Sequence, residues 1–342
     1  MNKGIKGWLA AMAALSLLAA CGKVPAPSSV VSQEQPLSQS QSMDAAKGEF
    51  PPAVTPEEEL SSSTASSAAE SVPVPAEKEE PEVIMSADSV KAGSSLFLLV
   101  KNAPEGVTPT AQTNMNYTPV FFPYGDGWAA AVAIRMVTQP GNYAITVAVG
   151  EETKNLSLQV TDGGFEVETF EVDQSVADST VNNSNANAEF NRVTEPMKKQ
   201  ADGQKYWSGK FSLPLNQDSP RITSSYGYTR VVNGSASRHG GVDFAAPAGT
   251  PVLAPNAGRV LYAGYLQLTG NTVVVEHGFG LQSWYYHMES TTCKTGDMVS
   301  TGDELGKVGS TGFSTGPHLH FAMTVGGVFT NPWEYIENNM LS

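Results

Sequence analysis

Short β-type runs separated by turn residues fill the chain from Val83 onward, and they restrict the possible folds more than any other feature. Between residues 142 and 149, Tyr, Ile and Val alternate with smaller residues, which is the period of a half-buried strand. Ser95–Val100 and Trp128–Ile134 are further apolar runs, with Gly- and Pro-containing turns between the runs. This density of strands predicts a small β-sandwich-like module over residues 83–162.

The C-terminal part of the chain has the same β character. Residues 205–342 are glycine-rich and strand-dominated. Before them, a connecting segment over residues 163–204 contains one strand-like run and, at residues 186–200, a run that predicts a short helix. Because 342 residues exceed one ordinary domain, we expect a mainly β chain of more than one domain.

Residues 1–20 predict a secretory signal, because a positively charged start precedes an apolar run of 13 residues that ends at Ala20. The run is shorter than the ~20 residues that a membrane-spanning helix needs. Leu18–Cys21 resembles the lipobox of bacterial lipoproteins, which implies cleavage before Cys21 and attachment of lipid to its sulfur. We therefore expect an extracytoplasmic, membrane-anchored lipoprotein at the cell envelope; ordinary secretion is the alternative.

Residues 21–82 are rich in Ser, Pro, Ala and Glu and show no apolar period. Within residues 22–82, eleven acidic side chains stand against three basic ones, whereas residues 205–342 have nine against eight. Such a composition cannot bury enough surface to offset the entropy of ordering, so it predicts a disordered tether. The net charge of −14 argues against a nucleic-acid partner.

The chain has two cysteines, Cys21 and Cys293. Two are too few for a disulfide framework or for a zinc site built from thiolates. With Cys21 assigned to lipid, Cys293 is interpreted as a lone structural thiol. Any metal site must therefore use other ligands.

All five histidines lie in the last segment. His318 and His320 alternate with Leu319 and Phe321, so on a strand both imidazoles would project from one face into one cleft. Pro317 excludes a helix that enters at this point. Such a pair suits one metal ligand and one partner for the metal's water; two surface histidines are the alternative.

His239 and Asp243 are separated by two glycines and a valine, which makes a helix improbable. In an extended chain, residues i and i+4 share a face, so the two side chains can converge on one ion. With an imidazole from the His318–His320 pair, they supply a ligand set that suits Zn²⁺ and leaves a fourth position open for water. The chain contains no His-Glu-x-x-His motif, so a zinc peptidase of that kind is excluded.

Three runs together resemble the lysostaphin/LytM-type (M23) zinc metallopeptidases. His239–Val252 reads HGGVDFAAPAGTPV, Trp284–Met288 reads WYYHM, and Ser310–Phe321 reads STGFSTGPHLHF. The resemblance covers roughly residues 220–335, about a third of the chain. It implies that residues 205–342 form an antiparallel β-sheet peptidase domain with a groove.

The resemblance also implies a function. We expect a zinc-dependent endopeptidase that hydrolyses peptide cross-links of bacterial peptidoglycan, with peptidoglycan peptides and the membrane as its partners. One Zn²⁺ per chain would be held by His239, Asp243 and His320. The resemblance implies that His287 and His318 are the catalytic histidines, and the absence of a motif glutamate that could act as a base agrees with this.

Further assignments concern the surroundings of the site. Tyr226, Tyr228, Arg230 and Asn271 are predicted substrate contacts, although packing is an alternative role for the two tyrosines. His277 is predicted to be a turn residue outside the site.

Two competing functions remain at this point. Gly312–Gly316 fits the Gly-x-Ser-x-Gly nucleophile elbow, but that motif needs a helix after it, and Pro317 with a strand-like run follows instead. The other alternative is a catalytically silent wall-binding or activator module of the same fold.

Overall fold

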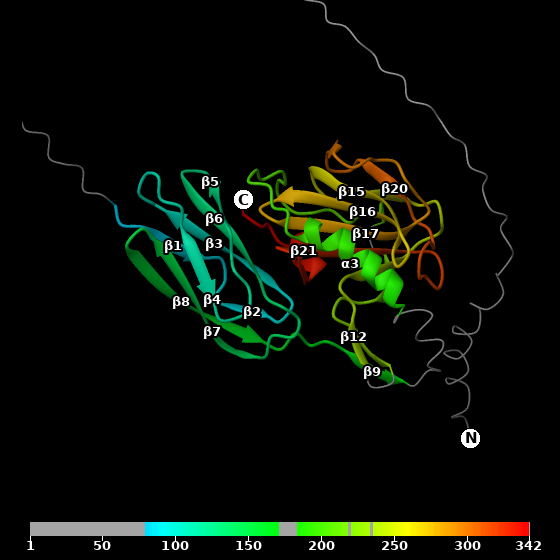
Figure 1. The fold of residues 1–342 in the computed structure, drawn as a ribbon, viewed down its shortest axis with the longest axis horizontal. Coiled ribbons are helices and arrows are strands. Elements are labelled where there is room, and N and C mark those ends of the chain that lie inside the picture. Colours follow the sequence, from blue (N-terminus) through cyan, green and yellow to red (C-terminus); the bar gives the residue numbers. More distant parts are fainter. Residues whose placement is uncertain (1–78, 171–182, 218–219, 233–234, 342) are drawn as a thin grey trace, which may run out of the picture. The chain divides into compact units, whose positions relative to one another are not determined.

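The computed structural model describes residues 79–170, 183–217, 220–232 and 235–341, and this part of the chain is mainly β, as predicted (Figure 1). The predicted signal peptide, Cys21 and the tether lie outside the described residues, except for the last four tether residues, where strand β1 begins at Glu82. No helix in the described ranges has the length and apolarity needed to cross a bilayer.

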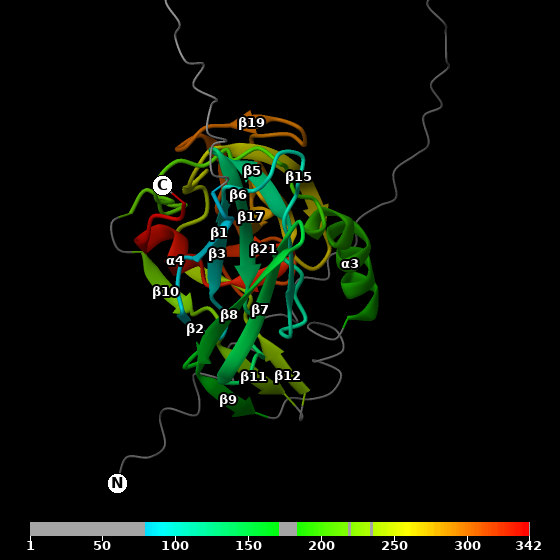
Figure 2. The same cartoon turned by 90° about the vertical axis from the view of Figure 1, so that its left-hand side faces the viewer.

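Two four-stranded sheets form the N-terminal module (Figure 2). In spatial order, the first sheet contains β1 (Glu82–Met85), β3 (Ser95–Lys101), β6 (Gly127–Ala133) and β5 (Phe121–Tyr124). The second contains β2 (Ser89–Lys91), β8 (Glu152–Thr161), β7 (Gly141–Val149) and β4 (Thr110–Thr113). Apolar side chains of both sheets share one buried cluster, so the predicted β-sandwich-like module is confirmed.

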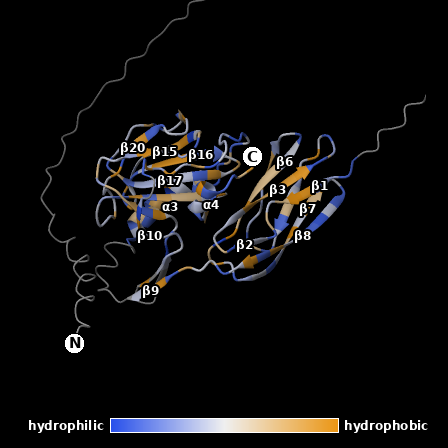
Figure 3. Cartoon of the chain, turned by 180° about the vertical axis from the view of Figure 1, so that it is seen from behind, coloured by the Kyte–Doolittle hydropathy of each residue, from blue (hydrophilic) through white to orange (hydrophobic). Residues whose placement is uncertain are grey.

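The first of these sheets is buried on both faces. Leu96 and Leu98 of β3 face the module's own cluster, whereas Phe97 between them belongs to a larger cluster shared with the C-terminal part. In strand β6, alternate side chains likewise belong to the module's own cluster and to the larger shared cluster. Double burial explains why these two strands read as continuous apolar runs, and they are predominantly hydrophobic in Figure 3.

One antiparallel sheet of eight strands dominates the C-terminal part. Seven strands follow the order β10 (Arg221–Ser224), β13 (Val242–Ala245), β21 (His318–Val325), β17 (Leu281–Met288), β16 (Gly270–Gly278), β15 (Gly258–Leu266) and β19 (Met298–Val299). The eighth, β22 (Val328–Thr330), pairs with β21. The register sets Asp243 and Tyr286 on either side of His320.

Two three-stranded sheets complete the β structure. One contains β12 (Ser235–Arg238), β11 (Thr229–Val232) and β9 (Val167–Phe170), in which β9 and β11 run parallel. The other contains β14 (Pro251–Leu253), β20 (Glu304–Lys307) and β18 (Ser290–Thr291). The first of these sheets leads directly into His239, because β12 ends one residue before it.

Within the described residues, two helices pack on this framework. Helix α3 (Ser184–Lys198) begins after Asn183, whose side chain accepts the Ala186 N–H at 3.0 Å; the sequence placed this helix two residues later in the chain. It buries its apolar face in a cluster with residues of β15, β16 and β17. Helix α4 (Pro332–Glu337) is capped by Asn331 and has proline in its first turn.

The module and the C-terminal sheet belong to one compact unit, residues 79–342. The Ser95 backbone N–H donates to Glu334 Oε2 at 3.0 Å, and the Ser95 and Tyr335 hydroxyls are hydrogen bonded at 2.8 Å. The Tyr226 hydroxyl reaches the Gly93 carbonyl at 3.0 Å. The module is therefore fastened to the C-terminal part by buried polar contacts and by a common apolar core.

Candidate metal centre

Three side chains from separate segments meet at one point of the large sheet. His239 follows β12, Asp243 lies on β13 and His320 lies on the neighbouring strand β21. His239 Nε2 is 3.1 Å from Asp243 Oδ1 and 3.0 Å from His320 Nδ1, and His320 Nδ1 is 2.9 Å from Asp243 Oδ1. The structure thus brings together the three residues that the sequence singles out as ligands.

This donor set fits a zinc ion. At Zn–N and Zn–O distances of about 2.0–2.1 Å, tetrahedral ligand atoms lie about 3.3 Å apart, close to the separations of 2.9–3.1 Å found here. The three side chains keep between 11% and 18% of their surface exposed, so the centre is open on one side. Three protein ligands at an open centre are typical of a catalytic zinc site, whereas structural zinc sites are closed by four.

A backbone carbonyl fixes the tautomer of His239. Its Nδ1 lies 2.9 Å from the Ser225 carbonyl, and a carbonyl can only accept, so Nδ1 carries the proton. The Ser224 hydroxyl lies 3.3 Å from the same nitrogen. The lone pair of Nε2 is thereby left facing Asp243 and His320, as metal ligation requires.

The carboxyl of Asp243 is ionised in this environment. Burial pushes its pKa upward, but the close imidazoles of His239 and His320 outweigh burial and hold the pKa well below its ordinary value. Burial also lowers the pKa of His320, against the opposing effect of Asp243. An anionic oxygen beside neutral imidazoles is the charge state in which these groups bind a divalent cation.

The two predicted catalytic histidines flank this centre. The His318 ring lies 4.8 Å from the His287 ring, and His318 Nε2 is 4.0 Å from Asp243 Oδ1. His318 Nδ1 donates to the Gly316 carbonyl at 2.8 Å, and His287 Nδ1 donates to the Thr311 carbonyl at 2.9 Å. In its neutral form, each ring therefore has its lone pair on Nε2.

His287 owes its position to an irregular end of β17. Its φ of 62° lies in the left-handed region, which non-glycine residues seldom adopt. Its backbone N–H donates to the Thr269 carbonyl at 2.8 Å, which holds this conformation. Burial lowers the pKa of His287 to about 4, so its ring is neutral near pH 7 and able to accept a proton.

Of the four predicted substrate contacts, Tyr226 is buried, and its hydroxyl lies within hydrogen-bond reach of the Gly93 and Phe329 carbonyls. Asn271 donates its side-chain amide to the Met288 and Glu289 carbonyls, directly after His287. These two side chains are therefore engaged within the protein.

The other two predicted contacts lie on the hairpin that leads to the centre. Tyr228 is half-buried, and its carbonyl accepts the His239 backbone N–H at 2.9 Å. Arg230 lies on β11, and its side chain is outside the described part of the structure.

The prediction that His277 is a turn residue is wrong. His277 lies inside β16 and is fully buried, with Nδ1 donating to the Ala257 carbonyl at 2.7 Å and Nε2 accepting from the Ser283 hydroxyl at 2.7 Å. Burial also raises the pKa of the Cys293 thiol to about 11. Both side chains lie apart from the metal centre and serve packing.

The sequence alone does not reveal the groups that orient the histidines. These are the carbonyls of Ser225, Thr311 and Gly316, and the aromatic ring of Tyr286, which stacks on His320 at 4.7 Å. Every residue has a carbonyl, so no sequence pattern marks the ones that matter. The Trp284–Met288 run contains Tyr286, but the sequence alone indicates no role for this side chain.

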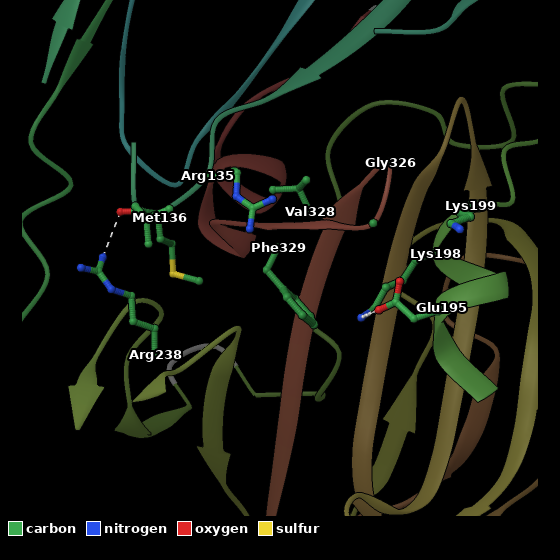
Figure 4. Close-up of a pocket in the computed structure, with 11 residues that line it drawn as sticks. Arg135, Met136, Glu195, Lys198, Lys199, Arg238, Gly326, Val328 and Phe329 are labelled. Atoms are coloured by element: carbon green, nitrogen blue, oxygen red, sulfur yellow. Dashed lines mark hydrogen bonds and ion pairs between the residues drawn. The ribbon is translucent and has the colours of Figure 1, made fainter. Parts of the chain in front are cut away.

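A separate cavity of about 790 Å³ does not include any residue of the centre (Figure 4). Its charged lining residues are Arg135, Glu195, Lys198, Lys199 and Arg238. Lys198 pairs with Glu195 at 2.8 Å, and Arg238 donates to the Met136 carbonyl at 2.9 Å. Half of the basic side chains are thus already engaged by the protein itself.

A mainly β fold that carries two histidines and an aspartate at an open centre, beside two further histidines, defines a metallopeptidase type of site. Residues 237–332 match the model of Peptidase family M23. The chain therefore contains an M23 metallopeptidase domain, with His239, Asp243 and His320 at its metal site.

Curated relatives resemble about a third of the chain. It is 38% identical over 117 residues to peptidoglycan DD-endopeptidase ShyC of Vibrio cholerae, and 43% identical over 116 residues to cell division protein DipM of Caulobacter vibrioides. Each match covers 34% of this chain, but 27% of the first relative and 18% of the second. The chain thus spans about a quarter or less of their length.

The likeness to a solved structure reaches further. A crystal structure assigned to peptidase M23 from Pseudomonas aeruginosa shares 26% identity at a TM-score of 0.52. The match covers 72% of this chain and 93% of the Pseudomonas aeruginosa chain, so the likeness extends beyond residues 237–332.

Proposed function

We propose that this protein is a zinc-dependent endopeptidase that hydrolyses peptide cross-links of bacterial peptidoglycan. The observation that carries the proposal is the convergence of His239 Nε2, Asp243 Oδ1 and His320 Nδ1, with the imidazoles of His287 and His318 beside them. One zinc per chain is the proposed cofactor, held by the first three residues.

The proposed mechanism assigns each group a task. Zinc supplies a Lewis acid that polarises the scissile carbonyl and lowers the pKa of water. The Nε2 atom of His287 or of His318 accepts a proton from the attacking water. The resulting imidazolium stabilises the developing oxyanion and returns the proton to the leaving amine. A groove beside the centre is proposed to hold the cross-linking peptide.

The substrate assignment rests on the relatives. One of them bears the name peptidoglycan DD-endopeptidase and is 38% identical over the matched residues. We therefore assign the bond between a D-alanyl residue and a diamino acid as the target, in preference to a glycine bridge. Mass spectrometry of fragments from digested peptidoglycan of each type distinguishes the two bonds.

The location of the enzyme is part of the same proposal. The apolar run before Cys21 supports export and a lipid anchor at this cysteine, which would keep the enzyme at the cell envelope. Labelled palmitate should mark the wild-type protein and spare Cys21→Ser. Equal labelling of the two proteins would exclude the anchor.

Two single substitutions test the assignment of roles. His320→Ala should lose zinc, because it removes a ligand, whereas His318→Ala should retain zinc and lose turnover by roughly 10²–10⁴-fold. Metal content and the release of free amines from purified peptidoglycan measure the two effects. Equal loss of zinc in both variants would contradict the assignment.

The alternative is a catalytically silent module that binds the wall or activates another enzyme. It is kept because the relative with 43% identity is named a cell division protein. Stoichiometric zinc without any cleavage of peptidoglycan would favour this alternative, and cleavage that stops on chelation would exclude it.

A further inference from the structure

Tyr286 lies directly beside the proposed ligand His320. The two residues are paired across β17 and β21, and their rings are parallel, with 3° between the planes and 4.7 Å between the centroids. Tyr286 is only 6% exposed, so its ring forms a fixed wall against the imidazole. Nδ1 of His320 can face Asp243 only while the imidazole keeps this orientation.

Tyr286 is in turn held by other aromatic rings. Phe190 of helix α3 lies 6.1 Å from it at 88°, and Trp284 lies 6.4 Å from it at 78°, both in T-shaped geometry. All three residues belong to the apolar cluster under helix α3. A chain of ring contacts thus runs from the helix to the metal centre.

Helix α3 is anchored near both of its ends. Glu189 Oε2 accepts the Gln267 backbone N–H at 2.8 Å. At the other end, Gln282 Nε2 donates to the Met197 carbonyl at 2.9 Å and to the Gln200 carbonyl at 3.1 Å. The helix lies outside residues 237–332, the part that matches the family. The bonds of Gln282 fix the helix to β17, the strand that carries Tyr286.

The hydroxyl of Tyr286 is buried and has no hydrogen-bond partner among the described residues. The contact with His320 is therefore made by the ring alone. We propose that Tyr286 is a positioning residue for the metal ligand His320, and that helix α3 holds Tyr286 in place through Phe190. This inference rests on the proposed function for the role of His320 as a ligand.

Zinc affinity of the purified full-length protein tests the inference without any measurement of activity. Tyr286→Ala should weaken zinc binding by roughly 10- to 100-fold, as expected when the support of a ligand is lost. Phe190→Ala should weaken it in the same direction by a smaller factor. Tyr286→Phe keeps the ring and should retain wild-type affinity.

Val193→Ala provides the matched control, because Val193 is a partly buried residue of the same helix that packs on the same cluster. It should bind zinc as the wild type does. With Co²⁺ in place of zinc, the visible absorption spectrum should change in Tyr286→Ala and stay unchanged in Tyr286→Phe and Val193→Ala, because only the first substitution frees the ligand.

Wild-type affinity and an unchanged cobalt spectrum in folded Tyr286→Ala would overturn the inference. If that variant does not fold, Phe190→Ala decides, because it leaves the sheet intact. An equal loss in Phe190→Ala and Val193→Ala would also overturn it, since general loosening of the helix would then be the cause. The proposed function fails separately, if His320→Ala still binds zinc with wild-type affinity.

Discussion

Backbone carbonyls, rather than side chains, determine which nitrogen of each imidazole is available at the centre. His239, His287 and His318 all donate Nδ1–H to a carbonyl. A carbonyl cannot be removed by a substitution, so the orientation of these rings depends on the conformation of the loops that present it. Changes in loop conformation should therefore affect catalysis as strongly as changes of the histidines themselves.

Glu276 and His277 are adjacent buried groups with opposite effects on stability. Burial lowers the pKa of the His277 imidazole in the folded protein to about 4, compared with 6.5 in the unfolded chain. As the pH falls, the unfolded chain is therefore protonated first, and the folded state loses stability between pH 6.5 and pH 4. Burial raises the pKa of Glu276 to about 7, so its contribution is complete below pH 4.5 and is lost as the pH rises through 7.

Between pH 7 and pH 5, each of these two contributions amounts to about 2 kcal/mol, and in the wild type they nearly cancel. When the pH falls from 7 to 5, the unfolding free energy of Glu276→Gln should therefore decrease by about 2 kcal/mol relative to wild type. That of His277→Gln should increase by about the same amount over the same change of pH. Urea unfolding at the two pH values measures both changes. Parallel pH dependence in the two variants would contradict the assignment.

At the level of elements, the turn between β15 and β16 supports the loop that orients His287. Gly270, the first residue of β16 after this turn, has a φ of +66°, and a Cβ added there would lie 2.1 Å from Thr311 Oγ1 and 2.4 Å from the Thr311 carbonyl carbon. The Thr311 carbonyl accepts the Nδ1–H of His287 at 2.9 Å. The close approach of two loops thus positions the ring of His287, which we propose to be catalytic.

Gly270→Ala should lower kcat at least tenfold and leave zinc bound, because Thr311 must move and take its carbonyl away from His287. Gly296→Ala is the matched control: its φ of +96° gives similar backbone strain, but a Cβ there meets no atom within 4 Å. Turnover on peptidoglycan and metal content of both variants are the measurements. Equal kcat in the two variants would show that Thr311 does not orient the ring.

Some of these elements were predictable from the sequence, and others were not. The alternation in residues 142–149 correctly predicted a strand, because that strand has one buried face. The two-residue period of a strand also correctly predicted that His318 and His320 lie on the same face, where both approach Asp243. His277 was misjudged because the glycine after it suggested a turn, whereas the structure continues β16 through that glycine.

The unpredicted part of the site consists of tertiary contacts. The stacking of Tyr286 on His320 depends on the pairing of β17 with β21, two strands that are far apart in the sequence. Similarly, nothing in the composition of residues 183–200 indicates which face of the sheet the helix covers. Long-range register and packing leave no local pattern in a single sequence.

At the scale of the whole molecule, the module and the M23 domain share one apolar core. Phe97 of the module lies 6.4 Å from the ring of Trp207, and both side chains are 2% exposed. We propose the domain limits 83–162 and 205–342 for the module and the peptidase, with residues 163–204 as the connection. Packing across these limits makes the two parts mutually stabilising.

Phe97→Ala should therefore destabilise the peptidase sheet as well as the module, by about 3–5 kcal/mol. Hydrogen exchange should show loss of protection in β16 and β17 together with β3. Leu98→Ala is the matched control, because this neighbouring side chain faces the module's own core and should speed exchange in the module first. Unchanged protection of β16 and β17 in Phe97→Ala would show that the parts are independent.

The carbonyl of Gly93 receives both the Tyr226 hydroxyl and the Asn331 backbone N–H, at 3.0 Å and 2.9 Å. One carbonyl of the module thus binds both Tyr226, which follows the first strand of the peptidase sheet, and Asn331, which caps helix α4. The module is thereby joined to the peptidase part at both the beginning and the end of that part. We therefore expect the sandwich and the catalytic sheet to move together when the protein approaches a substrate.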